Sequence, residues 1–382
     1  MSDEFPVVII GTGLAGYSLA REFRKQNKST PVLMISQDDG HSYSKPMLST
    51  GFTKGKDADG LSMADPGKMA EQLNVSIRTF TKVDAIDPSK KVLHIGSERL
   101  AYAKLVLATG ASVNRLRFPG SDDAKVVSIN DLMDYRDFRS QLSEGDHILI
   151  MGAGLIGCEY ANDLLNGDYP VTVVDPSKTA LNGLIPSPAG DAVIEGLSQA
   201  GATMLMNRFV ETLERDGDKL NASLSDGSSI TADIVISAIG LKPDLTLAES
   251  AQLKCNRGII TNRLLETSHD DVYALGDCAE VDGHVLLYVL PLMASARALA
   301  KTLNNEPTPV NYGVMPVATK TPACPVIVSP PLQQTGEWQF EQEGINIKGL
   351  YKKGDELLGF VLTGDRISEK QALSKELSGI HS

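Results

Sequence analysis

Residues 7–16 of the chain read Val7-Val8-Ile9-Ile10-Gly11-Thr12-Gly13-Leu14-Ala15-Gly16, and residues 148–157 repeat the pattern as Ile148-Leu149-Ile150-Met151-Gly152-Ala153-Gly154-Leu155-Ile156-Gly157. In each copy an apolar run precedes a Gly-x-Gly-x-x-Gly phrase that opens a helical pattern. In that setting the first glycine permits a tight turn, the second lets the backbone approach a pyrophosphate, and the third lets helix and strand pack closely. The helix amino terminus then offers unpaired N–H groups to the phosphates. The sequence therefore predicts two dinucleotide-binding folds, with all six positions of the first phrase and Gly152, Gly154, Leu155, Ile156 and Gly157 of the second at the ligand.

Each phrase lies in a predicted strand–helix–strand unit. The first unit comprises a strand at 6–10, a helix at 17–25 and a strand at 31–35, and the second comprises a strand at 147–151, a helix at 155–165 and a strand at 171–174. Strands that alternate with helices in this way are typical of a parallel sheet. We expect an α/β fold with two Rossmann-like domains.

The rest of the chain suggests how the domains are joined. Apolar runs at 105–108 and 234–239 each lead to a glycine, and polar segments with Pro or Gly follow at 115–121 and 241–244, as expected of interdomain crossings. The last 65 or so residues are short apolar runs between Gly-rich turns, which predict an antiparallel meander with a terminal helix at 368–377. The predicted domains are a discontinuous first domain at 1–114 and 243–317, an inserted second domain at 115–242, and a small α+β C-terminal domain at 318–382.

Length and composition limit the class of protein. A chain of 382 residues exceeds the roughly 250 to 300 residues of a single core, so two or three domains are expected. Apolar residues make up 42% of the chain, yet no run approaches the roughly 18 residues of a membrane span. The acidic start at residues 1–6 leads straight into a strand, so we expect no signal peptide, no membrane insertion and a cytoplasmic protein. A net charge of −12 argues against nucleic-acid binding.

The four cysteines, Cys158, Cys255, Cys278 and Cys324, are far apart in the sequence and form no Cys-x-x-Cys pair. This spacing does not match the usual zinc or iron–sulfur signatures, so we predict no metal site. Any electron-transfer centre must then be an added cofactor. Cys158 and Cys278 adjoin glycine-rich motifs, but small buried cysteines commonly only pack, and we interpret them in that way.

The two strand–helix–strand units differ in the residue that follows their second strand. Asp175 comes directly after the strand at 171–174, where a carboxylate accepts hydrogen bonds from ribose hydroxyls and repels a 2′-phosphate. This favours NADH over NADPH, although Lys178 could soften the preference. The first unit has no carboxylate until Asp38 and Asp39, so its ribose could be held by Ser36, by backbone, or by an aspartate that reaches back.

Three later stretches carry a resemblance to a known family. They are Leu105-Val106-Leu107-Ala108-Thr109-Gly110, Val235-Ile236-Ser237-Ala238-Ile239-Gly240-Leu241-Lys242-Pro243, and Thr267-Ser268-His269-Asp270-Asp271-Val272-Tyr273-Ala274-Leu275-Gly276-Asp277-Cys278-Ala279. In order and spacing they resemble the two-dinucleotide-binding flavoprotein oxidoreductases. The resemblance implies tightly but non-covalently bound FAD in the first domain and NAD(P)H in the inserted one. It also implies cofactor contacts at Thr109, Gly110 and Gly240, and a contact from Asp277 to the ribityl and phosphate region of the flavin.

The segment Tyr43-Ser44-Lys45-Pro46-Met47-Leu48-Ser49 resembles the Arg/Lys-Pro-x-Leu-Ser segment of the ferredoxin reductase-like members. There it places a cation, here Lys45 beside Pro46, near the flavin and its phosphates. Thiol-based members of the family carry a reactive cysteine near this point. Because Ser49 and Thr50 take that place here, we do not expect thiol-based catalysis.

Within the family the resemblance covers essentially the whole chain in those members that reduce rubredoxin. It includes Leu286-Leu287-Tyr288-Val289-Leu290-Pro291-Leu292-Met293 and Lys320-Thr321-Pro322-Ala323-Cys324-Pro325. By this resemblance the backbone at Val83 contacts the adenine side of FAD, Val289 the pyrimidine side of the flavin, and Lys320 its polar edge. Glu159 and Lys45 are expected to form an ion pair that positions the nicotinamide. Lys45, Glu159 and Lys320 are the predicted catalytic residues, although Glu159 could be only a helix-end charge and Lys320 only a surface lysine.

The function implied is an NADH-dependent flavoprotein reductase. FAD would take a hydride from NADH and pass single electrons to rubredoxin, and the resemblance suggests an alkane hydroxylase system as the pathway. A ferredoxin or a flavorubredoxin is the alternative acceptor. A flavin-binding protein that senses redox state and turns over little is the alternative of another class.

Overall fold

The computed structural model describes residues 5–121 and 126–381. Met1–Glu4, part of the acidic start considered above, lie outside the described residues. The chain divides into two compact units. Unit 1 comprises Met1–Lys45, Gly60–Ser112 and Leu241–Tyr312, and unit 2 comprises Pro46–Asp59, Val113–Gly240 and Gly313–Ser382.

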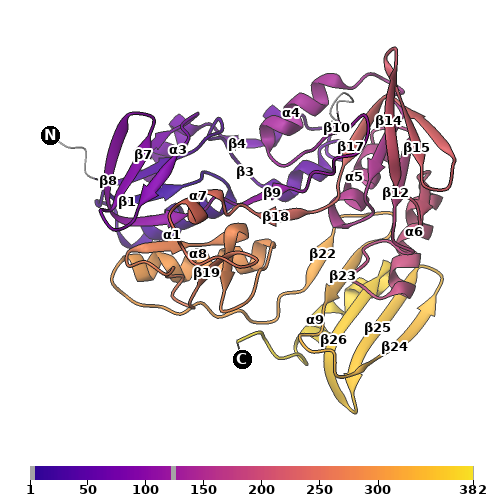
Figure 1. The fold of residues 1–382 in the computed structure, drawn as a ribbon. Helices are drawn as coiled ribbons and strands as arrows, with labels where there is room; N and C mark the ends of the chain where they lie inside the picture. Colours follow the sequence, from indigo (N-terminus) through magenta and orange to yellow (C-terminus); the bar gives the residue numbers. More distant parts are fainter. Residues whose placement is uncertain (1–4, 122–125, 382) are drawn as a thin grey trace. The chain divides into compact units, whose positions relative to one another are not determined.

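Unit 1 is built on a sheet whose centre is the strand before the first glycine phrase. β1 (Phe5–Ile10) pairs in parallel with β2 (Val32–Ile35) and with β8 (Glu98–Leu107), and β20 (Val272–Ala274) pairs with β8. These strands are buried because helices cover a parallel sheet, so the α/β prediction is confirmed here. α1 (Leu14–Gln26) packs against α8 (Val289–Leu303), and the two helices lie side by side (Figure 1).

The remaining elements of unit 1 are short. The strands are β3 (Ser42–Tyr43), β4 (Ser62–Ala64), β5 (Ser76–Arg78), β6 (Ala85–Asp87), β7 (Val92–Ile95), β19 (Ile259–Thr261) and β21 (Ala279–Val281). The helices are α3 (Pro66–Leu73), α7 (Thr246–Ser250) and the 3₁₀ turn η2 (Gly276–Cys278). β9 (Ala111–Val113), β18 (Leu241–Pro243), α2 (Ala58–Leu61) and η1 (Lys45–Thr50) lie where the chain passes between the units.

Unit 2 repeats the arrangement around the second glycine phrase. β11 (Ile148–Met151) pairs in parallel with β12 (Val171–Asp175) and with β17 (Ile234–Ser237), in a sheet completed by β10 (Val126–Val127) and β13 (Thr203–Met206). The helices are α4 (Leu132–Gln141), α5 (Leu155–Leu165) and α6 (Ser187–Gln199). The predicted second strand–helix–strand unit therefore forms with ends within a residue or so of those expected.

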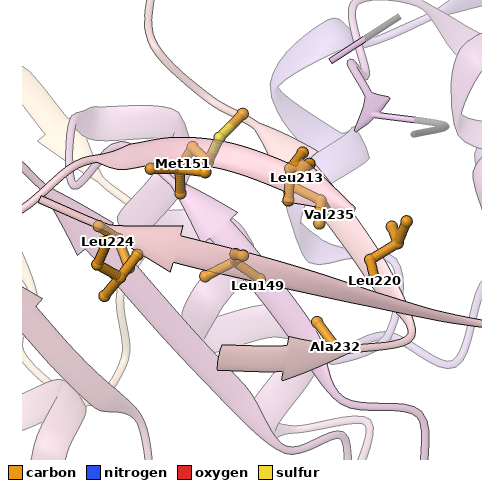
Figure 2. Close-up of a cluster of buried hydrophobic side chains, with 10 residues drawn as sticks. Leu149, Met151, Leu213, Leu220, Leu224, Ala232 and Val235 are labelled. Atoms are coloured by element: carbon orange, nitrogen blue, oxygen red, sulfur yellow. The ribbon is translucent and has the colours of Figure 1, made fainter. Parts of the chain in front are cut away.

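A three-stranded antiparallel sheet that the sequence analysis did not anticipate packs on the parallel sheet of unit 2. Its strands are β14 (Val210–Asp216), β15 (Lys219–Leu224) and β16 (Ser229–Ala232). Figure 2 shows Leu149, Met151 and Val235 of the parallel sheet gathered with Leu213, Leu220, Leu224 and Ala232 of the antiparallel one. The alternate burial along β15 is that of a strand with one face on a core.

The C-terminal residues form an antiparallel sheet, as predicted, but in a different strand order. The order is β22 (Val317–Thr319), β23 (Val326–Ser329), β26 (Glu356–Thr363), β25 (Asn346–Lys353), β24 (Glu337–Glu343). Only the last three strands form a meander, because β23 pairs with β22 and β26 and not with β24, the next strand in the sequence. α6 packs against β25 and β26, and a Cβ built on Gly196 would lie 2.6 Å from the Cβ of Cys324, so this sheet shares unit 2.

The predicted terminal helix at 368–377 is wrong in extent. The chain forms the 3₁₀ segment η3 (Gly364–Glu369) and then α9 (Lys370–Ser374), a helix of only five residues. Leu373 is its one buried residue. A single apolar anchor stabilises about one turn, since packing and not propensity holds most short helices.

The assignment of Pro46–Asp59 to unit 2 is also unexpected from the sequence. Asp163 of α5 is buried, and its carboxylate accepts hydrogen bonds from the backbone N–H groups of Phe52 and Thr53 at 3.1 and 2.8 Å and from the hydroxyl of Thr53 at 2.7 Å. A Cβ on Gly51 would lie 2.0 Å from the hydroxyl oxygen of Tyr135. These contacts tie the segment after Lys45 to the second dinucleotide fold.

Candidate functional site: two dinucleotide cradles

The first glycine phrase turns tightly against its own sheet. Gly11 has φ of 114°, and a Cβ there would lie 2.2 Å from the carbonyl oxygen of Ala108. A Cβ on Gly16 would lie 2.0 Å from the carbonyl oxygen of Gly11. Protein atoms alone therefore require glycine at both positions. We call residues 11–16 the first cradle.

The second phrase has the same geometry, and residues 152–157 are the second cradle. Gly152 has φ of 108° and would place a Cβ 2.6 Å from the carbonyl oxygen of Ala238. A Cβ on Gly157 would lie 1.9 Å from the carbonyl oxygen of Gly152. The two cradles thus share their internal packing.

The middle glycine of each cradle differs from the other two, because the packing of the protein alone does not require glycine there. A Cβ on Gly13 or on Gly154 would meet nothing within 4 Å. Both residues are helix N-caps without a side chain, so neither N-cap supplies an acceptor to the first N–H groups of α1 and α5. A group that needs close backbone approach and N–H donors, such as a pyrophosphate, fits both places.

Asp175 at the end of β12 is fixed beside the second cradle. Its carboxylate accepts hydrogen bonds from the backbone N–H of Ala153 at 2.7 Å and from that of Ser177 at 2.7 Å. Each carboxylate oxygen has a second lone pair to offer. The half-buried side chain is therefore oriented and can still accept bonds from a ribose.

Asp277 lies beside the first cradle. A Cβ on Gly276, whose φ is 77°, would lie 2.8 Å from the Cβ of Ala15, so η2 and the start of α1 are in close contact. Burial raises the pKa of Asp277, and the positive charge of Lys45 lowers it. Two predicted cofactor residues from distant parts of the sequence are thus brought to the first cradle.

Glu159 of α5 is fully buried and is contacted by three donor groups from two residues of unit 2. Its carboxylate accepts hydrogen bonds from the Ser49 hydroxyl at 2.6 Å and from the Lys320 backbone N–H at 2.9 Å, and it forms an ion pair with the Lys320 Nζ. A buried carboxylate costs several kcal/mol unless it is paired and hydrogen-bonded. The structure therefore joins two of the three predicted catalytic residues, Glu159 and Lys320, directly.

The third predicted catalytic residue, Lys45, is the last residue of the first segment of unit 1. Its expected ion pair with Glu159 joins different units and stays a prediction. Pro46 begins the segment held by α5.

The other predicted cofactor residues have varied surroundings. Gly110 has φ of 73° and an open Cβ direction, and the Thr109 hydroxyl donates to the carbonyl of Asp244 at 3.3 Å. Gly240 has φ of 104°, Val83 is buried, and Val289 is 38% exposed as the first residue of α8. Ser36 is buried directly after β2. Their roles at a cofactor stay predictions.

Cysteine chemistry is disfavoured by burial. Burial raises the pKa of all four thiols, to about 11 for Cys324. Cys158, Cys278 and Cys324 are buried, and the Cys158 thiol donates to the carbonyl of Ala153 at 3.3 Å. A raised pKa keeps the thiolate, the reactive form, scarce.

Sequence reasoning missed several residues that organise the site. Asn162 accepts the backbone N–H of Ala323 at 2.9 Å, and Asp163 holds the segment after Lys45. With Glu159 they place three polar side chains on a helix that is otherwise apolar. The i, i+4 spacing of Glu159 and Asp163 puts both acids on one face, and this was the signal that the sequence offered.

Within the described ranges, 5–121 and 126–381, no three His, Cys, Asp or Glu side chains gather as a metal site. None of the helices in those ranges is long and apolar enough to cross a membrane.

Two parallel sheets, each with a glycine cradle at a helix start, define an α/β protein with paired dinucleotide-binding folds. The chain belongs to the pyridine nucleotide-disulphide oxidoreductase family, whose family model matches residues 5–301. Residues 309–377 match the model of a rubredoxin binding C-terminal domain.

Three individual proteins illustrate the relationship. A rubredoxin-NAD(+) reductase of Alcanivorax borkumensis is 50% identical over 98% of this chain and 99% of its own length. A nitric oxide reductase FlRd-NAD(+) reductase of Aliivibrio fischeri is 35% identical over 98% of both chains. The solved ferredoxin reductase of Rhodopseudomonas palustris has the same fold, with a TM-score of 0.87, 23% identity, and coverage of 98% of this chain and 95% of its own.

Proposed function

We propose that this chain is an NADH-dependent FAD protein that passes single electrons to rubredoxin. The observation that carries the proposal is the match of residues 309–377 to a rubredoxin binding domain, in a chain that is half identical to a rubredoxin-NAD(+) reductase over nearly its full length. The more distant FlRd-NAD(+) reductase supports the alternative, a flavorubredoxin acceptor, less strongly at 35% identity.

Each cofactor is proposed for one cradle. The first cradle, with Asp277 and Lys45 nearby, would hold the pyrophosphate of FAD, and the second, with Asp175, would hold that of NADH. The open Cβ directions of Gly13 and Gly154 support both placements, because they leave the backbone accessible. A carboxylate at Asp175 would accept the ribose hydroxyls and repel a 2′-phosphate, which favours NADH over NADPH.

The chemistry needs a group that accepts two electrons and releases them singly. FAD would supply this chemistry when bound, because a flavin ring can accept a hydride and release the two electrons singly. The protein has to orient the two nucleotides and control charge beside them.

The residues on α5 and the 320–325 turn are suited to that work. The Lys320 Nζ forms an ion pair with Glu159, and the Lys320 side chain is 30% exposed. The ammonium group is therefore held in position and is still accessible. We propose that this ammonium group stabilises negative charge that develops at the flavin, and that Glu159 orients it. Lys45 would contribute a second positive charge near Asp277, whose pKa it lowers.

The acceptor is tested by NADH-driven cytochrome c reduction with added rubredoxin, ferredoxin or flavorubredoxin in turn. Turnover that rises strongly with rubredoxin alone is expected. Turnover with ferredoxin only, or with flavorubredoxin only, would contradict the proposal and identify the acceptor.

A second test separates an enzyme from a redox-sensing flavin protein. Rapid anaerobic bleaching of the bound flavin by NADH, with no partner present, is expected of the reductase. Slow bleaching that never supports repeated turnover would favour the sensor.

We further propose three domains: residues 1–114 together with 243–317, residues 115–242, and residues 318–382. We also propose that the chain serves an alkane hydroxylase system. Growth on alkanes of a strain that lacks this chain tests that pathway.

A further inference from the structure

The two cradles differ at the position that follows the second strand of each fold. The backbone N–H of Gly11 donates to the carbonyl of Ile35 at 2.8 Å, and that of Gly152 donates to the carbonyl of Val174 at 2.8 Å. These matching bonds put Ser36 of the first fold in the place of Asp175 in the second. A neutral hydroxyl thus occupies the position of the usual acid.

A carboxylate from two residues further along bonds to that hydroxyl. Oδ1 of Asp38 accepts hydrogen bonds from the Ser36 hydroxyl, from the Thr12 hydroxyl at 3.3 Å and from the backbone N–H of Gly40 at 2.9 Å. Thr12 is the residue between the first two glycines of its cradle, as Ala153 is in the second, and Ala153 donates to Asp175. Both cradles therefore bond this same position to an aspartate.

The other oxygen of Asp38 is left as an acceptor. All the hydrogen bonds that the Asp38 carboxylate receives from the described residues go to Oδ1. Three donors on one oxygen fix the direction of Oδ2. The side chain is half-buried, and the buried Tyr17 holds the turn by donating its hydroxyl to the carbonyl of Gly40.

The neighbouring carboxylate, Asp39, is directed elsewhere. Its oxygens accept the backbone N–H of His41 at 3.1 Å and lie 3.1 Å from the His41 Nδ1. Asp38 and Asp39 are adjacent and equal in charge, so a role for charge alone and a role for position are separable by mutation.

We propose that Asp38 binds the ribose hydroxyls of the adenosine half of FAD through Oδ2, with Ser36 and Thr12 as the residues that orient it. This inference rests on the proposed function, in which the first cradle holds FAD. At the first cradle, a serine and an aspartate two residues further along then do what the single aspartate does at the second cradle. A carboxylate at this place accepts from vicinal hydroxyls, which neither a serine nor a backbone N–H does equally well.

The test uses the full-length protein freed of flavin and titrated with two ligands, FAD and FAD built with 2′-deoxyadenosine, followed by flavin fluorescence. The wild type is expected to prefer FAD by about tenfold, the size of one hydrogen bond to a charged group. Asp38→Ala should bind both ligands with equal, weaker affinity. Ser36→Ala should reduce the preference partly, and the matched control Asp39→Ala should keep it.

Loss of the preference is a measurement that a merely structural role of Asp38 would not produce, because weaker folding lowers the affinity for both ligands together. If Asp38→Ala keeps the wild-type preference, or if the wild type shows none, the inference is wrong. Should the alanine variant fail to fold, Asp38→Asn keeps the side-chain size and is subject to the same two criteria.

The outcome is distinguishable from failure of the proposed function. A wild type that binds FMN but not FAD, or whose bound flavin NADH does not reduce, contradicts the proposed function. A wild type that binds FAD and is reduced by NADH, while Asp38→Ala retains the preference, contradicts this inference alone.

Discussion

The first and second cradles have the same glycine geometry and different acids. In both, a Cβ on the first or third glycine would lie within 2.6 Å of a backbone carbonyl oxygen, whereas the middle glycine meets no protein atom. Asp175 is the last residue of β12, and Ser36 holds the corresponding place in the first fold. The glycine phrase therefore encodes a backbone shape, and the ligand that it holds is specified by residues outside the phrase.

The helices that follow the cradles differ as well. Two residues beyond the third glycine, α5 carries the fully buried Glu159, and α1 carries the buried but neutral Ser18. Of these two positions, only Glu159 on the second helix needs a countercharge, which Lys320 provides. The second fold is thus the one in which charge removal should cost most.

Lys320→Met is expected to have the largest effect. The substitution leaves the Glu159 carboxylate buried without its ion pair, which costs about 3 to 5 kcal/mol in comparable cases. The free energy of unfolding in urea measures it. The control is Lys348→Met, which breaks a partly exposed pair with Glu369 and should cost less than about 1 kcal/mol. Equal costs for the two variants would contradict the role assigned to burial.

Gly157→Ala should be next in size and should act on stability. Its Cβ would lie 1.9 Å from the carbonyl oxygen of Gly152, so α5 must shift, at a cost of about 1 to 3 kcal/mol. Gly154→Ala, the matched variant in the same cradle, should cost less than about 1 kcal/mol and weaken NADH binding instead. Thermal unfolding and NADH titration measure both. A stable Gly157→Ala protein with normal NADH affinity would contradict the shared geometry.

Asp175→Ala distinguishes the ligands of the cradles. It should raise the KM for NADH by about tenfold and narrow the preference over NADPH, because a charged hydrogen-bond acceptor for the ribose is lost. Flavin content should not change. Steady-state kinetics with both nucleotides and the flavin absorbance of the purified protein check this. Loss of flavin with unaltered NADH kinetics would mean that the two cofactors are assigned to the wrong folds.

The local features of the two folds could be predicted from the sequence, and the pairing of distant segments could not. The strands before each phrase, the helices after them and the place of Asp175 follow from apolar periodicity and short spacings, which neighbouring residues determine. The pairing of β23 with β26 depends on residues some thirty positions apart, and no local pattern records it. The strand order was therefore predicted wrongly although the strands were found.

Buried polar groups were the hardest to predict. Asp163 accepts hydrogen bonds from Phe52 and Thr53, more than a hundred residues away. The i, i+4 spacing with Glu159 placed both acids on one helix face, but it did not identify these partners. An aspartate that reaches back, Asp38 or Asp39, was one of three open alternatives for the first ribose, because its distance from the first cradle depends on how the 36–40 turn folds. In both cases the partner is specified by tertiary structure, while the sequence shows only the residue type.

The smallest effect concerns Asp277 at the first cradle and appears as a pH dependence. Burial raises the pKa of Asp277 in the native state, so the flavin-free native protein binds this proton more tightly than the unfolded chain does. Its stability should fall as the pH rises from the ordinary pKa of aspartate, about 4, through the raised value. Asp277→Asn should remove that fall and add on the order of 1 kcal/mol to the free energy of unfolding at neutral pH.

Asp65→Asn is a control of opposite sign in the same unit. The backbone N–H of Lys68 lowers the pKa of Asp65, so the stabilising effect of this carboxylate is lost as the pH falls. Unfolding of the two variants and the wild type between pH 2 and 8 checks both slopes, because the Asp65 effect falls below about pH 4 and the Asp277 effect above it. Identical slopes for Asp277→Asn and wild type would show that this carboxyl is not the buried group of the first cradle.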